Sequence, residues 1–127
     1  MKNGVNIERK SEYLLVTVTD FLYQEVAMKC FQEILSACIE FNTQKVLLDF
    51  HLIDNKLSMV DEVIYIKRIA LEYQQYIDAN NPPLKIAFWG GSGLVKPHSP
   101  SPKIGKETGL DMIVTDSETA AIDWLNH

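Results

Sequence analysis

Residues 45–50 read KVLLDF, a short apolar run that is followed by a polar stretch and then by a helical pattern. Its length suits a β-strand. Its lack of polar alternation is typical of a strand that is covered on both faces of a sheet, as in proteins whose helices flank a parallel sheet. The run therefore predicts a central, largely parallel sheet.

Further strands are predicted on both sides of this run. They are VNIERK (5–10), EYLLVTVTD (12–20), LKIAFW (84–89) and LDMIVTD (110–116). The first two meet at a short connection of Lys10 and Ser11, which indicates an antiparallel hairpin.

Helices are predicted between and after the strands, because apolar residues recur there every three or four positions. The long ones cover residues 22–41 and 59–79, and a shorter one covers residues 117–126. Asp20 is a candidate cap for the first helix and Asn42 its stop. Thr115 and Glu118 have capping-box spacing before the last helix.

A long loop is predicted over about residues 90–102, where three prolines follow the stretch GGSG. A short helix over 103–108 then ends at Gly109, a suitable left-handed residue. The order of elements is ββαβαβαβα. It predicts one α/β domain over residues 1–127, in which helices flank a mixed five-stranded sheet.

The composition is that of an ordinary globular protein. Of its residues, 46% are hydrophobic and 23% charged, and 12 basic against 17 acidic residues give a net charge of −5. This balance argues against a nucleic-acid-binding protein. No window approaches 18 uninterrupted apolar residues and the N-terminus is polar, so we expect neither a membrane span nor a signal peptide. We expect a cytoplasmic protein.

The two cysteines, Cys30 and Cys38, lie eight residues apart in one predicted helix. That separation is about 12 Å at 1.5 Å per residue. Because a disulfide needs Cα atoms closer than about 7 Å, the two thiols cannot pair there. They are expected to be reduced, inert residues of the core.

No catalytic constellation stands out in the sequence. His51, His98 and His127 are scattered, and GGSG matches neither common phosphate-loop pattern. Asp49 ends a predicted strand, where ligand crevices of α/β sheets lie. An enzyme that uses Ser58 or the acids Asp49, Asp54, Asp61 and Glu62 is a third-ranked alternative. The sequence predicts no catalytic residue, cofactor or metal site.

Nearly the whole chain resembles the STAS-like family of bacterial anti-sigma-factor antagonists. The resemblance rests on the order and spacing of YLLVTVTD, KVLLDF followed by KLSMVDE, LKIAFWGG and IVTDSETAAIDWL. It implies a STAS fold and a non-enzymatic role in binding a protein or a ligand. In the antagonists, an Asp-Ser-Ser/Thr-Gly motif opens the second helix and its first serine is phosphorylated by a partner kinase. The aligned residues 57–60 read LSMV and share only Ser58 with that motif.

Two interpretations of Ser58 follow. Its hydroxyl can cap the helix, since Asp61 stands three positions later. It can also accept a phosphate, although the surrounding acids would repel that charge. In either case we expect a partner-binding surface at the turn and the start of the second helix. It consists of Asp54, Lys56, Ser58, Met59, Asp61, Glu62 and Ile64.

The second helix carries more apolar side chains than one buried face needs, and Ile64 and Leu71 fall outside that face. This surplus is consistent with deeper burial under loops, with a protein partner such as a regulatory kinase or an anti-sigma-like protein, or with a homodimer. It also suggests an alternative function, a carrier of an apolar small molecule or lipid, which requires an internal pocket.

Overall fold

The predicted central strand is β3 (Lys45–Phe50), the middle strand of a five-stranded sheet with the order β1-β2-β3-β4-β5. The structure is a computed structural model that describes residues 5–19, 24–52, 59–90, 106–107 and 109–127. At residues 24–27 and 59–62 it describes the backbone. Within β3, every side chain from Val46 to Phe50 is buried, which confirms that both faces of the strand are covered.

The predicted hairpin is confirmed. β1 (Val5–Arg9) and β2 (Leu14–Val18) pair antiparallel, and the Lys10 backbone N–H donates to the Tyr13 carbonyl oxygen at 2.9 Å in the turn. The remaining neighbours, β2 with β3, β3 with β4 (Lys85–Gly90) and β4 with β5 (Asp111–Thr115), pair parallel. The sheet is therefore mixed, with its one antiparallel pair at the β1 edge.

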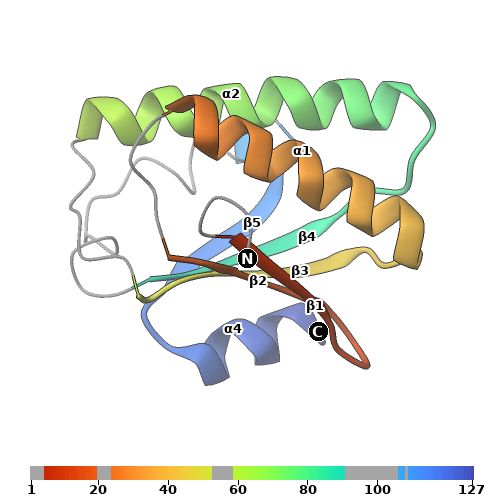
Figure 1. Cartoon of the computed structure of the whole chain (residues 1–127), viewed down its shortest axis with the longest axis vertical. Helices are drawn as coiled ribbons and strands as arrows, with labels where there is room; N and C mark the ends of the chain where they lie inside the picture. The colour runs from red at the N-terminus through yellow and green to blue at the C-terminus, as the bar shows by residue number, and fades with distance from the viewer. Residues whose placement is uncertain (1–4, 20–23, 53–58, 91–105, 108) are drawn as a thin grey trace.

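Helices cover both faces of the sheet, as Figure 1 shows. α1 (Gln24–Phe41) and α2 (Met59–Asp78) lie on one face, and α4 (Glu118–Leu125) lies on the other. Asn42, with φ of 51°, follows α1 and confirms the predicted stop; Asn80, with φ of 68°, follows α2. Asparagine tolerates this left-handed conformation better than most residues.

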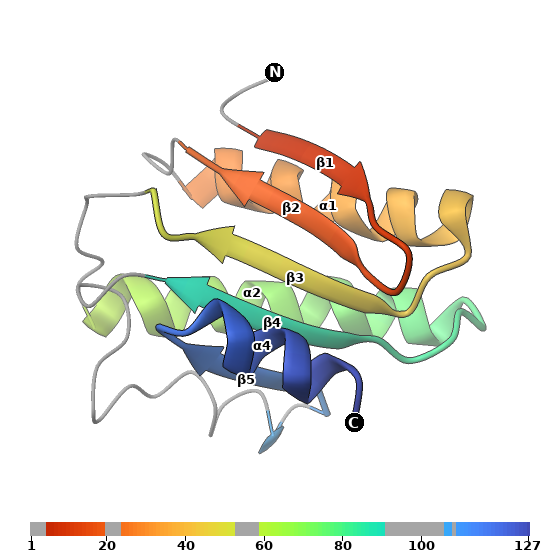
Figure 2. The same cartoon turned by 90° about the horizontal axis from the view of Figure 1, so that it is seen from below.

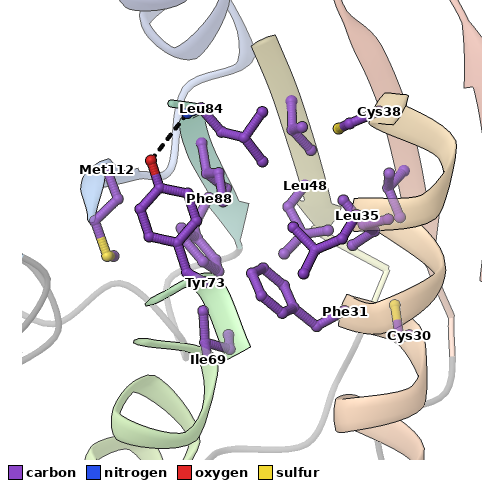
Figure 3. Packing of buried hydrophobic residues seen from close by; sticks show 14 of the residues in the cluster. Cys30, Phe31, Leu35, Cys38, Leu48, Ile69, Tyr73, Leu84, Phe88 and Met112 are labelled. Carbon is purple, nitrogen blue, oxygen red and sulfur yellow. Dashed lines mark hydrogen bonds between the residues drawn. The ribbon is translucent and has the colours of Figure 1, made fainter. Parts of the chain in front are cut away.

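The core has two parts, one on each face of the sheet. The larger lies under α1 and α2 and includes Phe31, Leu48 and Ile69, as Figure 3 shows. There the backbone N–H of Leu84 donates to the buried Tyr73 hydroxyl at 3.0 Å. The smaller part, under α4, consists of Leu47, Ala87, Ala121 and Leu125.

The start of α4 corrects one prediction. Ser117, and not Thr115, is the N-cap, because its hydroxyl accepts the backbone N–H of Ala120 at 3.2 Å. The Thr115 hydroxyl instead accepts the backbone N–H of Ser117 at 3.1 Å, in the segment that precedes α4. Thr115 still belongs to β5, so its backbone is committed to the sheet. Capping-box spacing alone therefore placed the cap two residues early.

The far end of α4 is fixed to β4 by one lysine. Lys85 Nζ donates to the Trp124 carbonyl oxygen at 2.8 Å and lies 4.4 Å from the centroid of the Trp124 ring. A cation at a helix C-terminus satisfies a carbonyl that has no partner within the helix. This contact orients α4 along the sheet.

Two further sequence predictions lie partly outside the described residues. Of the short helix predicted over 103–108, residues 106–107 are described and are helical. Gly109 has φ of 84°, which confirms the predicted left-handed residue. Of the predicted loop, Gly90 is described and ends β4. Within the described part of the chain, no helix has both the length and the apolarity that a membrane span requires.

Candidate functional site

Polar and aromatic side chains meet at the carboxyl ends of the parallel strands. The register places Thr17 beside Asp49, Asp49 beside Trp89, and Trp89 beside Thr115. Asp49 alternates with Leu48 and Phe50 and so lies on the α4 face of the sheet, as Leu47 does. The carboxyl ends of the strands are where ligands bind to the parallel sheets of α/β proteins.

Asp49 is the one buried charged side chain among the described residues, with 4% of its surface exposed. Its Oδ1 accepts the backbone N–H of His51 at 2.9 Å and is also hydrogen-bonded to His51 Nδ1. A carboxylate that binds the N–H two residues later forms an Asx-turn. Asp49 therefore ends β3 and fixes the direction in which the chain leaves the sheet.

The His51 ring lies flat against Trp89 of the neighbouring strand. Their centroids are 4.2 Å apart and their planes differ by 13°. The imidazole side chain is 39% exposed, so one face packs on the indole while part of the ring reaches solvent. A carboxylate at Nδ1 directs a ring N–H toward itself and leaves Nε2 as the outward nitrogen.

This Asp49–His51–Trp89 cluster (the strand-end cluster) was missed by the sequence analysis, which treated Asp49 and His51 separately. The usable signal was an aspartate two residues before a histidine at a strand end, the spacing of an Asx-turn. No described group of three histidine, cysteine or acidic side chains is placed to hold a metal ion. The described contacts orient an imidazole and close a turn.

The predicted partner-binding surface is only partly described. Asp54, Lys56 and Ser58 lie outside the described residues, so capping or phosphorylation of Ser58 stays a prediction. Met59, Asp61 and Glu62 form the first turn of α2, whose backbone is described. Ile64 is the one member whose side chain is described, and 41% of its surface is exposed.

The surplus apolar residues of α2 reach the surface. Leu71 is 67% exposed, and it lies seven positions, or about two turns, after Ile64. The opposite side of α2 is buried through residues such as Tyr65 and Ile69. Lys67 and Arg68 are exposed between the two apolar residues. For Ile64 and Leu71, the alternative of burial under loops is therefore wrong, because both side chains are exposed. We call these two residues and the exposed side chains between them the α2 stripe.

Three hollows that described residues line are open surface grooves. One of about 570 Å³ lies beside the α2 stripe and is lined by Lys67, Ala70, Leu71, Gln74 and Glu107. Another of about 480 Å³ is lined by residues around Leu110 and Met112. A third of about 690 Å³ lies between β1 and α1. The internal pocket that a lipid carrier requires stays a prediction.

Both cysteines are free and buried, as expected. Burial raises the pKa of the Cys30 thiol to about 12, with a smaller contribution from the charge of Glu33. Burial also raises the pKa of the Cys38 thiol to about 12. Since the thiolate is the reactive form, neither cysteine acts as a nucleophile near neutral pH.

Because of these two buried thiols, we expect the free energy of unfolding to decrease at alkaline pH. Each has a folded pKa of about 12 against an ordinary value of 9.0. Their contribution is fully present below about pH 9. It falls between about pH 9 and about pH 12, because there the unfolded chain releases both protons and the folded chain keeps them. Urea unfolding at about pH 7.5 and about pH 10.5 should show this decrease in the free energy of unfolding.

A Cys30→Ala/Cys38→Ala variant is the control for this decrease. The buried tyrosines, such as Tyr65, whose pKa burial also raises, contribute to the decrease in both proteins. The variant should therefore lose less stability than the wild type over the same pH interval. Equal losses in the two proteins would contradict a role of the thiols.

The strand order, the mixed sheet and the helices on both faces define a STAS-like α/β fold. A solved structure titled as an anti-sigma factor antagonist from Mycobacterium paratuberculosis has this fold. It superposes with a TM-score of 0.54 over 97% of this chain and 93% of the other, at 13% sequence identity. No protein-family model matches the sequence, and neither does any curated protein. The structural likeness thus shows the fold, and the fold expected from the resemblance is confirmed.

Proposed function

We propose that this protein is a non-enzymatic regulatory module that binds a protein partner through residues 54–62 and the α2 stripe. The observation that carries the proposal is the exposure of Ile64 and Leu71 on one side of a helix whose other side is buried. Two apolar side chains two turns apart are suitable anchors for a partner, and nearby charges supply a polar rim. The fold neighbour is itself an anti-sigma factor antagonist by title.

The proposed partner is a protein such as a regulatory kinase or an anti-sigma-like protein, met in the cytoplasm. A second copy of the chain is a further possible occupant of the α2 stripe. The strand-end cluster contributes to this function indirectly. It fixes the end of β3, from which the chain continues toward residues 54–62. Ser58, within that segment, is proposed either as a helix cap or as a site of regulation by phosphorylation.

The double substitution Ile64→Asp/Leu71→Asp should abolish partner binding, with recovery lowered at least about tenfold. Both side chains are exposed in the free protein, so the change affects folding little, whereas a buried aspartate in an interface costs several kcal/mol. The measurement is affinity capture from native cells with quantitative mass spectrometry. Circular dichroism and a urea titration confirm that the variant is folded.

Ile39→Asp is the matched control, because Ile39 is also an exposed apolar residue, 57% exposed, but lies on α1. It should leave partner recovery unchanged. The proposal is wrong if the α2 double variant is folded and still captures every partner. Sedimentation of the same proteins tests whether the α2 stripe binds a second copy of the chain. If the wild type is a dimer and the α2 double variant alone is not, the second copy is the occupant.

A further inference from the structure

The outer edge of β1 is open among the described residues. β1 is the first strand of the sheet and pairs with β2 on one side, as Figure 2 shows. In an antiparallel pair, the backbone groups of alternate residues point away from the partner strand. Such an edge can accept one more strand through main-chain hydrogen bonds.

A groove of about 690 Å³ runs between this edge and one flank of α1. Apolar residues of both elements line its bottom, Val5 and Ile7 from β1 and Ala37 and Phe41 from α1. The α1 side is also polar. It contributes the exposed residues Lys29, Gln32, Glu33, Ser36 and Glu40. The groove thus combines a strand edge, an apolar base and a charged wall.

The charge of that wall selects the occupant. Among the lining residues, Glu33 and Glu40 outnumber the single cation Lys29, and neither carboxylate forms an ion pair with another described side chain. Arg9 of β1 lies beside the groove, but its guanidinium lies over the Phe41 ring, 5.6 Å from the ring centroid. The net charge of −5 on the whole chain also attracts cations. We propose that the groove between β1 and α1 binds an extended, basic peptide segment of a partner protein as an additional strand. This site is separate from the α2 stripe.

The spacing of the two acids suggests the pattern of the peptide. Glu33 and Glu40 are seven residues apart on one helix, which is about 10.5 Å along its axis. Residues i and i+4 of a strand are about 13 Å apart and point to the same face. In a matching segment, arginines at i and i+4 therefore face Glu33 and Glu40. An apolar residue at i+2 then faces the apolar bottom of the groove near Ile7.

A second copy of the chain fits this edge less well. An antiparallel pairing of two β1 edges places both α1 helices on the same side of the joined sheet. The wall residues Glu33 and Glu40 of both copies would then lie across the junction from each other. Like charges in that arrangement repel, so the groove favours a cationic partner over itself.

The test uses two labelled peptides and fluorescence anisotropy with the full chain. The probe is Thr-Arg-Thr-Val-Thr-Arg-Thr, and the matched control peptide has glutamate in place of both arginines. Wild-type protein should bind the arginine peptide at least tenfold more tightly than the glutamate peptide. Glu33→Lys/Glu40→Lys should weaken arginine-peptide binding at least tenfold and reverse the preference. Hydrogen exchange should show new protection in β1 and none in β5.

A control variant with the same change in net charge distinguishes binding in the groove from a general effect of the charge of the protein. Glu118→Lys/Asp123→Lys alters exposed acids of α4, on the other face of the sheet, and should change arginine-peptide affinity less than twofold. Equal weakening by the two variants overturns the proposal, as does absence of binding at millimolar peptide. A wild-type dimer whose formation protects β1 from hydrogen exchange would instead assign the edge to a second copy, and would also overturn the proposal. Ile64→Asp/Leu71→Asp should keep peptide binding, so the two proposals fail independently.

Discussion

Leu48→Ala should lower the free energy of unfolding by about 3–4 kcal/mol, and Leu47→Ala by about 2–3 kcal/mol. The two leucines are neighbours on β3 and are 1% and 0% exposed. They point to opposite faces of the sheet, so each reports on a different layer of the core. The expected difference comes from what surrounds the cavity that each substitution leaves.

Leu48 is surrounded by the larger part of the core, which two long helices enclose. A cavity there cannot close without moving α1 or α2, so most of its energetic penalty remains. Leu47 packs with Ala87, Ala121 and Leu125 under the eight-residue α4. A short helix can move toward the sheet and fill part of the space.

Urea unfolding followed by circular dichroism measures both values at one pH. Leu15→Ala is a useful reference, because Leu15 lies half-buried on the α4 face of the neighbouring strand and should lose less than either leucine. A loss below about 1 kcal/mol for Leu47→Ala would mean that α4 does not cover the sheet. A larger loss for Leu47→Ala than for Leu48→Ala would contradict the proposed relaxation of α4.

The same pair of leucines explains why the fold could be predicted from the sequence. A run such as KVLLDF has no polar alternation, so both of its faces need cover, and helix patterns on both sides in the sequence supply it. The hairpin and the stops at Asn42 and Gly109 were also predictable, because they depend on local backbone preferences. The N-cap Ser117 was missed, with Thr115 predicted in its place, because β5 holds Thr115, a constraint from tertiary structure.

The candidate site could be predicted less well, for a physical reason. Periodicity identified Ile64 and Leu71 as surplus, but it cannot tell a buried side chain from an exposed one. The stacking of His51 on Trp89 joins residues 38 positions apart, and the register of β3 and β4 creates it. Contacts of this kind depend on the assembled sheet and leave no signal in either segment alone.

Asp49→Ala should destabilise the protein by about 2–3 kcal/mol, and Asp49→Asn by about 1 kcal/mol. Alanine removes the acceptor of both the His51 backbone N–H and the His51 ring, at a position that is 4% exposed. Asparagine keeps an oxygen at that position and can preserve the turn without the charge. A loss for Asp49→Asn that is small beside the loss for Asp49→Ala therefore means that Asp49 acts mainly as the hydrogen-bond acceptor that closes the turn.

Trp89 supplies a local readout of the same substitutions. The chain has two tryptophans, so in a Trp124→Phe background the fluorescence comes from Trp89 alone. Asp49→Ala should change this emission, because the imidazole is no longer held against the indole, whereas Asp49→Asn should leave it close to the parent. If Asp49→Asn instead disturbs stability and emission as much as Asp49→Ala, the negative charge itself is required. Asp49 would then stabilise the strand end through its charge beside His51, and not only by closing a turn.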